Sequence, residues 1–330
     1  MELLKKLTQA NSPSGNEGDI CHVIEKEIKE YCDEIKIDAL GNLIAHKKGL
    51  GDKIMFAAHM DEIGIIVTFI DENGFIRFSA VGGLYVKNMV HLKVRFSNGV
   101  IGVIGSEEEG FNKKPELSRL YVDIGAKNRE EAEKKVQIGD TAAFIGDYYI
   151  INDTVISKAL DNRAGCYVLI EALKRIKNTD NDLYFVFTVQ EEVGLRGAKA
   201  AAFAVKPDFA VAVDVTDTGD TPDAPVMAVK MGNGAAIKIM DRSVMCDSDV
   251  RTHLIETARK NHIPYQLEIM TDGGTDAGSI HLSGSGVKTG GISIPTRYIH
   301  SPSEMASVKD INSCVDLITL LASDKWKSNI

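Results

Sequence analysis

The hydrophobic pattern of this 330-residue chain changes type twice along its length. From about residue 67 to residue 151, short segments alternate apolar and polar residues and are separated by turns such as the Asn-Gly pairs at 73–74 and 98–99. This pattern is typical of β-hairpins. After residue 152, apolar strand segments alternate with helical segments, which favours a sheet covered by helices. The sequence therefore predicts an α/β fold with a mixed, largely parallel sheet and an inserted small β-rich domain.

The segments on either side of the hairpin region belong together in this prediction. The chain is longer than a usual single domain, so two domains are expected. We assign residues 1–66 and 152–330 to one α/β domain and residues 67–151 to the insert. In the first part, the apolar run at 54–58 predicts a buried strand that ends at His59.

Composition excludes several classes of function. The formal net charge is -9, which argues against a surface for nucleic acid because binding phosphates requires clustered lysine and arginine. No apolar run approaches the roughly 20 residues that cross a bilayer, and the N-terminus lacks the pattern of a signal peptide. The five cysteines are widely spaced, which favours free thiols in a reducing compartment over disulfides. We therefore expect a cytoplasmic protein without a membrane or nucleic-acid partner.

Acidic and histidine side chains follow the predicted strands or precede the predicted helices. They are His59, Asp161, the adjacent pair Glu191 and Glu192, and Asp214. In open α/β sheets, ligands bind at the carboxyl ends of the strands. We therefore expect these side chains to converge at one edge of the sheet, although they lie far apart in the sequence.

Each of these residues also has a purely structural interpretation. His59 alone suits a hydrogen-bonded core histidine, and Asp161 alone suits the N-cap of the following helix. Glu191 and Glu192 alone suit solvated loop residues, and Asp214 could open an acidic turn. Together they favour a metal site, because burying several charges at one sheet edge is costly unless a cation compensates them.

Histidine and carboxylate ligands without thiolate suit Zn²⁺, Co²⁺ or Mn²⁺. The candidate set is larger than the roughly three protein ligands of a single catalytic zinc. Two divalent ions that share a bridging carboxylate are therefore expected. Asp61 lies two residues after His59, so its carboxylate could accept the other imidazole N–H. Of Glu191 and Glu192, one could bind metal while its neighbour takes a proton from the attacking water.

Seven short segments, in this order along the chain, resemble those of the M42 family of metallo-aminopeptidases, the prokaryotic enzymes related to glutamyl aminopeptidase and the TET peptidases. With the flanking sequence, the resemblance extends from Ser12 to His300. The segments are AHMDEIG (58–64), ALDNRAG (159–165), QEEVGLRGA (190–198), VDVT (213–216), GDTP (219–222), GGTDAG (273–278) and IHSP (299–302).

The resemblance implies a role for each candidate residue. His59 and Asp214 would bind one metal ion, Glu192 and His300 the other, and Asp161 would bridge the two. Glu191 would be the general base for attack by a metal-bridging water, and Asp61 would lie behind the first histidine. His300 enters only through the resemblance, since no strand-end signal precedes it.

The resemblance also implies an architecture and a substrate. The fold would be of the zinc-peptidase type, and the insert would be similar in shape to a PDZ domain and serve in dimerisation and assembly. Subunits would form a tetrahedral dodecamer built from dimers. The substrates would be peptides with a free N-terminus, from which the enzyme releases N-terminal amino acids.

Two other functions compete with this one. The first is a glycoside hydrolase of the endoglucanase type that uses paired carboxylates. The second is a catalytically inactive metal-binding assembly protein, for which a free base at Glu191 would be unnecessary. Finally, the glycine-rich stretch at 284–291 lacks the spacing of a phosphate-binding loop and is interpreted as a flexible loop that lines the substrate cleft.

Overall fold

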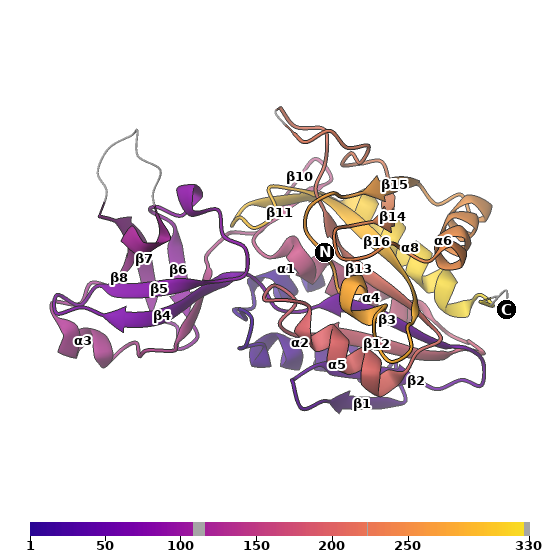
Figure 1. Cartoon of the computed structure of the whole chain (residues 1–330), viewed down its shortest axis with the longest axis horizontal. Coiled ribbons are helices and arrows are strands. Elements are labelled where there is room, and N and C mark those ends of the chain that lie inside the picture. The colour runs from indigo at the N-terminus through magenta and orange to yellow at the C-terminus, as the bar shows by residue number, and fades with distance from the viewer. Residues whose placement is uncertain (108–115, 223, 327–330) are drawn as a thin grey trace.

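The structure, a computed structural model, describes residues 1–107, 116–222 and 224–326. These residues form a large mixed sheet covered by helices and a separate six-stranded barrel, which lies to one side of the sheet in Figure 1. The mixed α/β architecture predicted from the sequence is thereby confirmed. The likeness of the insert to a PDZ domain stays a prediction.

Parallel pairing in the large sheet is confined to its centre and one edge pair. Four central strands run parallel to one another, and the strands on both sides pair with them in antiparallel fashion. The four are β12 (Asp182–Thr188), β3 (Lys53–His59), β13 (Phe209–Thr216) and β16 (Lys288–Arg297). The expectation of a largely parallel sheet was therefore too broad. The strands along the main path are β1 (Glu34–Ile37), β2 (Leu43–Lys47), β12 (Asp182–Thr188), β3 (Lys53–His59), β13 (Phe209–Thr216), β16 (Lys288–Arg297), β17 (Glu304–Ser307), β11 (Thr154–Ser157) and β10 (Tyr149–Ile151), with β14 (Ala235–Met240) on β16 and β15 (Tyr265–Ile269) on β14.

The central strands form because both of their faces are buried. In β3, Ile54 and Phe56 point to one hydrophobic cluster while Met55 and Ala57 point to the cluster on the opposite face. Successive side chains of a strand point to opposite faces, so a continuous apolar run suits a strand covered on both sides. The apolar run that was predicted to end at His59 does form this strand.

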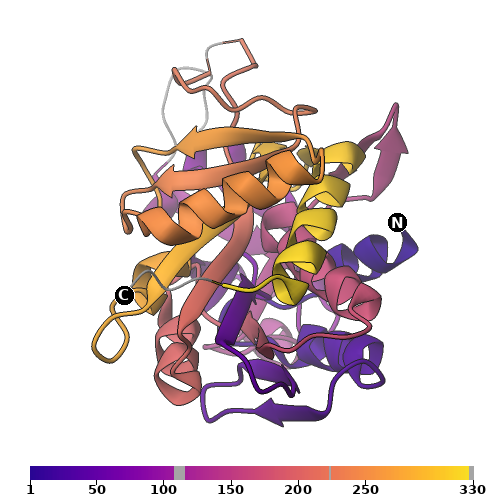
Figure 2. The ribbon, with the colours of Figure 1, turned by 90° about the vertical axis from the view of Figure 1, so that its right-hand side faces the viewer.

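Helices cover both faces of the large sheet. One face carries α1 (Glu2–Gln9), α2 (Gly18–Ile28), α4 (Leu160–Arg175), α6 (Ser248–Lys260) and α8 (Val308–Ser323). The other carries α5 (Arg196–Val205) and α7 (Ala277–Ile280). Figure 2 shows α6 and α8 lying side by side. Within the described residues, no helix is both long and apolar enough to cross a membrane.

The barrel has a hydrophobic core of its own, to which Ile65, Val94 and Phe96 contribute. A short helix, α3 (Arg129–Glu133), begins where the side chain of Asn128 accepts a hydrogen bond from the backbone N–H of Glu131. The strands, in the order in which they pair, are β4 (Gly64–Ile70), β5 (Ile76–Val81), β8 (Leu120–Asp123), β7 (Ile101–Ser106), β6 (Lys93–Phe96) and β9 (Thr141–Phe144), and two 3-10 helices occupy Val86–Asn88 and Leu117–Arg119.

The glycine-rich stretch at 284–291 differs from the prediction made from the sequence. The stretch at 284–291 does not form a loop at the candidate site, because Lys288 to Gly291 belong to β16. Gly284, Ser285 and Gly286 precede that strand and line a pocket at its amino end. Glycine occurs within this strand because α6 packs closely against it. A Cβ at Gly290 would lie 2.5 Å from the Val250 side chain, so a larger residue would hold α6 away from the strand.

Candidate metal centre

The predicted side chains meet at the carboxyl ends of the parallel strands. His59 is the last residue of β3, Asp214 lies near the end of β13, and Glu191 follows β12 closely. Asp161 lies at the start of α4, and His300 lies three residues beyond the end of β16. The residues at the strand ends in the sequence therefore predicted the right edge of the sheet, and β16 is the strand that brings His300 to it.

Two sets of three side chains lie close enough to hold a metal ion each. In the first, His59 Nε2 is 3.1 Å from Asp161 Oδ1 and 3.5 Å from Asp214 Oδ1. In the second, His300 Nε2 is 3.3 Å from Asp161 Oδ2 and 3.2 Å from Glu192 Oε2. Within each set, all ligand atoms lie within 4.8 Å of one another. Asp161 belongs to both sets and presents a different oxygen to each histidine.

The electrostatics of these groups suit bound cations. Burial raises the pKa of Glu192 and Asp214, so the ionised carboxylates are unfavourable here without positive charge. Burial also acts to raise the pKa of Asp161, but hydrogen bonds with His300 and His59 outweigh it and lower this pKa. Although burial opposes the change, Glu192 and Asp161 raise the pKa of His300 to about 12. Protonated histidine thus supplies the positive charge that a metal ion would otherwise supply.

An unpartnered atom supports the same interpretation. Glu192 Oε1 is buried and has no hydrogen-bond partner among the described residues. Such a group is costly in a folded protein unless something unseen satisfies it. The histidine and carboxylate donors, with no thiolate among them, fit Zn²⁺, Co²⁺ or Mn²⁺. The residues present therefore fit a metal site.

Asp61 connects the first histidine to the pair of glutamates. Its Oδ1 lies 3.5 Å from His59 Nδ1, and the same oxygen accepts the backbone N–H of Glu191 at 3.1 Å. Its Oδ2 accepts the backbone N–H of Glu192 at 3.3 Å and the Ser14 hydroxyl at 2.6 Å. Asp61 is fully buried. It therefore fixes the distance between β3 and the loop that carries both glutamates.

Glu191 lines the pocket without belonging to either set of ligand atoms. Burial raises its pKa well above the usual value; the charge of His59 opposes this effect, and the nearby carboxylates of Asp214 and Asp276 add to it. A carboxylate with a raised pKa is the stronger base, which suits proton transfer near neutral pH. The geometry thus separates the adjacent glutamates, with Glu192 beside His300 and Glu191 free to face the pocket.

Two further buried carboxyl groups were missed in the sequence. Glu304 Oε2 accepts the backbone N–H of Asp161 and its Oε1 accepts that of His300, both at 2.9 Å. It therefore holds two segments that carry candidate ligands at a fixed separation. Asp276 accepts a hydrogen bond from the Thr188 hydroxyl, and burial raises its pKa to about 7. A single acidic residue after a turn gives no pattern that predicts such roles.

The quoted segments also contain a buried ion-pair network beneath the centre. Glu62, next to Asp61, accepts hydrogen bonds from Lys158 Nζ at 2.5 Å and from Arg163 Nη2 at 3.2 Å. Arg163 is fully buried and also donates to the backbone carbonyl of Leu7 at 2.6 Å. This network joins α1 and the start of α4 to the loop after β3, and so helps to hold the residues of the centre in place.

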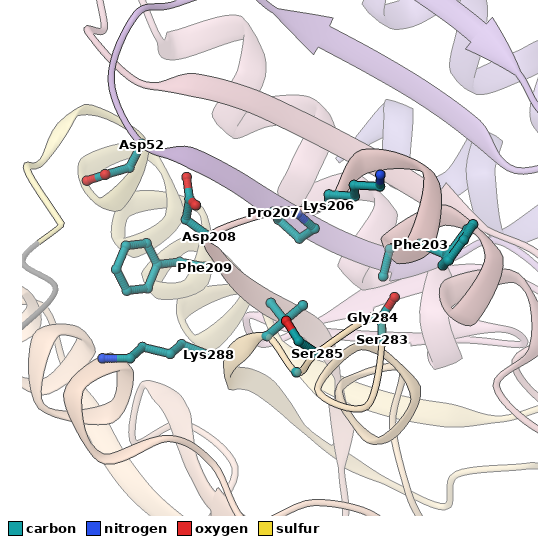
Figure 3. Close-up of a pocket in the computed structure, with 13 residues that line it drawn as sticks. Asp52, Phe203, Lys206, Pro207, Asp208, Phe209, Ser283, Gly284, Ser285 and Lys288 are labelled. Atoms are coloured by element: carbon teal, nitrogen blue, oxygen red, sulfur yellow. The ribbon is translucent and has the colours of Figure 1, made fainter. Parts of the chain in front are cut away.

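The centre opens into a pocket of about 480 Å³, walled in part by Tyr85, Met270 and Ile299. A second pocket, of about 520 Å³, lies elsewhere (Figure 3). Asp52, Phe209 and Lys288 line it, and these residues stand at the amino ends of β3, β13 and β16. Because β3 spans seven residues, the two edges of the sheet lie about 20 Å apart.

Known proteins are similar to almost the whole chain. A family model described as M42 glutamyl aminopeptidase matches residues 41–317, which include every predicted ligand. A putative aminopeptidase of Acetivibrio thermocellus is 59% identical over 96% of this chain and 96% of that protein. A lysyl aminopeptidase of Pyrococcus furiosus is 35% identical over 98% of this chain and 96% of that protein.

Solved structures agree with these relatives. A TET1 peptidase of Pyrococcus horikoshii, which can assemble into a tetrahedron or a large octahedral shell, matches with a TM-score of 0.90 at 36% identity. The match covers 98% of this chain and 99% of that one. Fold and sequence therefore point to the same group of proteins.

Proposed function

This chain belongs to the M42 glutamyl aminopeptidase family and is an aminopeptidase, and from that premise we propose that it works with two divalent metal ions. His59 and Asp214 would hold one ion, Glu192 and His300 the other, and Asp161 would bridge them. The observation that carries this proposal is the position of Asp161, whose two oxygens each face a different histidine. Zn²⁺ and Co²⁺ suit these donors best, with Mn²⁺ as a third candidate.

A bound pair of divalent cations supplies positive charge that polarises the scissile carbonyl and lowers the pKa of a water molecule. Glu191 would take the proton from the attacking water and deliver it to the amine of the departing peptide. Its burial supports this role, because a shielded carboxylate with a raised pKa both accepts and returns a proton readily. Asp61 would keep Glu191 in place through the backbone N–H that it accepts.

The bridging role of Asp161 is tested by counting bound metal. Native protein stripped with a chelator and then titrated with Co²⁺ or Zn²⁺ should bind two ions per subunit and recover hydrolysis of aminoacyl anilides. Asp161→Asn should reduce both the stoichiometry and the recovered activity, because asparagine carries no charge to share between two cations. Undiminished binding of two ions by this variant would contradict the bridge.

The same stripping experiment separates the competing functions. A glycoside hydrolase that relies on paired carboxylates would keep its activity after chelation and would cleave a cellulose-type substrate. An inactive assembly protein would bind metal and hydrolyse neither substrate. The proposed aminopeptidase should lose anilide hydrolysis on chelation and regain it with metal.

We assign the assembly function to the insert at residues 67–151 and catalysis to residues 1–66 with 152–330. The barrel supports a separate insert because its core is distinct from that of the large sheet, but the bounds differ by a few residues. Its strands run from Gly64 to Phe144, and β10 (Tyr149–Ile151) pairs within the large sheet. By analogy with the TET1 peptidase, the subunits would form a homo-oligomer, namely a tetrahedral dodecamer built from dimers. Light scattering should then give about twelve subunit masses, and substitutions on the outer face of the barrel should reduce this mass.

A further inference from the structure

The pocket around the candidate metal centre contains acidic residues beyond those assigned to metal ions and proton transfer. Asp217 lies in the loop after β13, and Asp272 lies in the loop after β15. Both are exposed, and both line the pocket. Of the described residues that line it, none is a lysine or an arginine. A substrate side chain in this pocket therefore meets negative charge without a neighbouring protein cation other than histidine.

These two carboxylates are also uncommitted. Within the described part of the chain, neither forms a hydrogen bond or a salt bridge. Asp220 provides the contrast, since it lies only three residues after Asp217 and accepts a hydrogen bond from Arg297 Nη2 at 2.7 Å. An unpaired carboxylate that lines a pocket is available to a ligand, whereas a paired one serves the protein's own structure.

The proposed metal ions would not neutralise the negative charges of Asp217 and Asp272. Two divalent ions would bring four positive charges, against which Asp161, Glu192 and Asp214 set three negative ones. The centre itself is thus close to neutral toward a substrate. Asp217 and Asp272 then set the sign of the potential around the substrate's N-terminal side chain.

The pocket also offers apolar surface beside these charges. Met270 and Ile299 line it, and Met270 is close in sequence to Asp272. A lysine or arginine side chain suits such a surface, because its methylene stem packs against apolar groups while its charged end reaches a carboxylate. A glutamate side chain would be repelled by the same carboxylates.

We propose that Asp217 and Asp272 give this aminopeptidase a preference for peptides whose N-terminal residue is lysine or arginine. The proposal rests on the proposed function, since it takes the pocket at the metal centre as the place where the N-terminal residue binds. It names two specificity-determining residues that take no part in metal binding or proton transfer.

The test compares three anilide substrates on the metal-loaded enzyme, with N-terminal lysine, norleucine and glutamate. Norleucine matches the stem of lysine and lacks only its ammonium group, so the ratio of kcat/KM for lysyl over norleucyl substrate measures the contribution of the charge. We expect lysyl substrate to be cleaved best and glutamyl substrate worst. Added salt should lower the ratio, because it screens exposed charges.

Variants locate the effect. Asp217→Asn and Asp272→Asn should each lower the lysyl-to-norleucyl ratio by about two- to fivefold, the range expected for an exposed ion pair. The double variant should lower it further, while hydrolysis of the norleucyl substrate stays within about twofold of the native rate and shows that the variants are folded. Asp52→Asn is the matched control, because it removes the same charge at the distant pocket of Figure 3.

The outcomes are distinct. A native enzyme that favours norleucyl or glutamyl substrate overturns the proposal, and so does a double variant with an unchanged ratio. Failure to cleave any of the three substrates, or cleavage that survives chelation, would instead contradict the metal-dependent function from which the proposal starts.

Discussion

The two pockets at opposite ends of the parallel strands are close in volume, at about 480 Å³ for the carboxyl end and about 520 Å³ for the amino end, yet they hold charge in different ways. At the carboxyl end, His59, Asp161 and Asp214 are buried and lie within reach of one another. At the amino end, Lys206 and Asp208 are exposed to solvent, and Lys288 pairs with Asp249.

This difference shows what identifies a catalytic site in such a fold. Exposed charges are solvated by water and change little on folding, so they need no ligand to stabilise them. Buried carboxylates and histidines shift one another's pKa and are retained where chemistry requires them. The two pockets differ little in volume, so size does not separate them, whereas the burial of charge points to the carboxyl end.

The largest expected effect is the loss of the proposed base at the carboxyl end. Glu191→Gln should lower kcat by about a thousandfold, within the range attributed to general acid–base catalysis. Metal content should stay unchanged, because Glu191 belongs to neither set of ligand atoms. Steady-state kinetics and metal analysis on the same preparation check both parts, with Asp52→Asn as the variant expected to behave as native. A variant that kept native turnover would remove Glu191 from the mechanism.

Metal affinity should depend steeply on pH at the carboxyl end. Although burial opposes it, nearby carboxylates raise the pKa of His300 to about 12 and raise that of His59 well above its usual value. Both histidines are therefore protonated in the metal-free protein at neutral pH and would have to release their protons to bind the proposed metal ions. Because these folded-state pKa values are raised and each set of ligand atoms contains one histidine, the affinity for each ion should increase with pH by about tenfold per unit. Calorimetric titration in buffers of different ionisation enthalpy counts the protons.

A substitution of Asp61 tests whether a residue that orients the candidate ligands affects metal binding. Asp61→Asn keeps the size of the side chain but removes the charge that faces His59 Nδ1 and weakens the bonds to the glutamate loop. Metal affinity should fall by about ten- to a hundredfold, as for other residues that orient a histidine ligand. Competition with a coloured chelator measures the change, and unchanged affinity would reduce Asp61 to a packing role.

The sequence predicted the carboxyl edge of the sheet well because its strands are simple. The run at 54–58 is apolar on both faces, and a polar residue at the end of such a run marks the edge of the sheet. Strand β16 escaped prediction because it contains Gly290 and Gly291, which are unfavourable in strands. They are tolerated because Val250 and the Lys238 side chain occupy the space where their Cβ atoms would lie. His300 follows this unrecognised strand, so only the family resemblance placed it.

Pairing between distant segments was the other limit. The antiparallel flanks of the sheet depend on contacts such as that of β11 with β17, which local periodicity does not encode. Glu304 shows the same limit at the level of one residue. Its two hydrogen bonds join Asp161 to His300, segments separated by more than a hundred positions, and a lone glutamate carries no sign of such a role.

The smallest expected effect is that of removing an exposed charge at the amino end of the parallel strands. Asp208 Oδ2 accepts the backbone N–H of Lys53 at 2.9 Å in an exposed position. In Asp208→Asn the amide oxygen can still accept this hydrogen bond, and water solvates whatever the change leaves unpaired. The free energy of unfolding should therefore change by no more than about 0.5 kcal/mol, with metal affinity and kcat unchanged. Urea unfolding and the anilide assay measure these quantities, and a large loss of activity would show that charge at this edge acts on the distant centre after all.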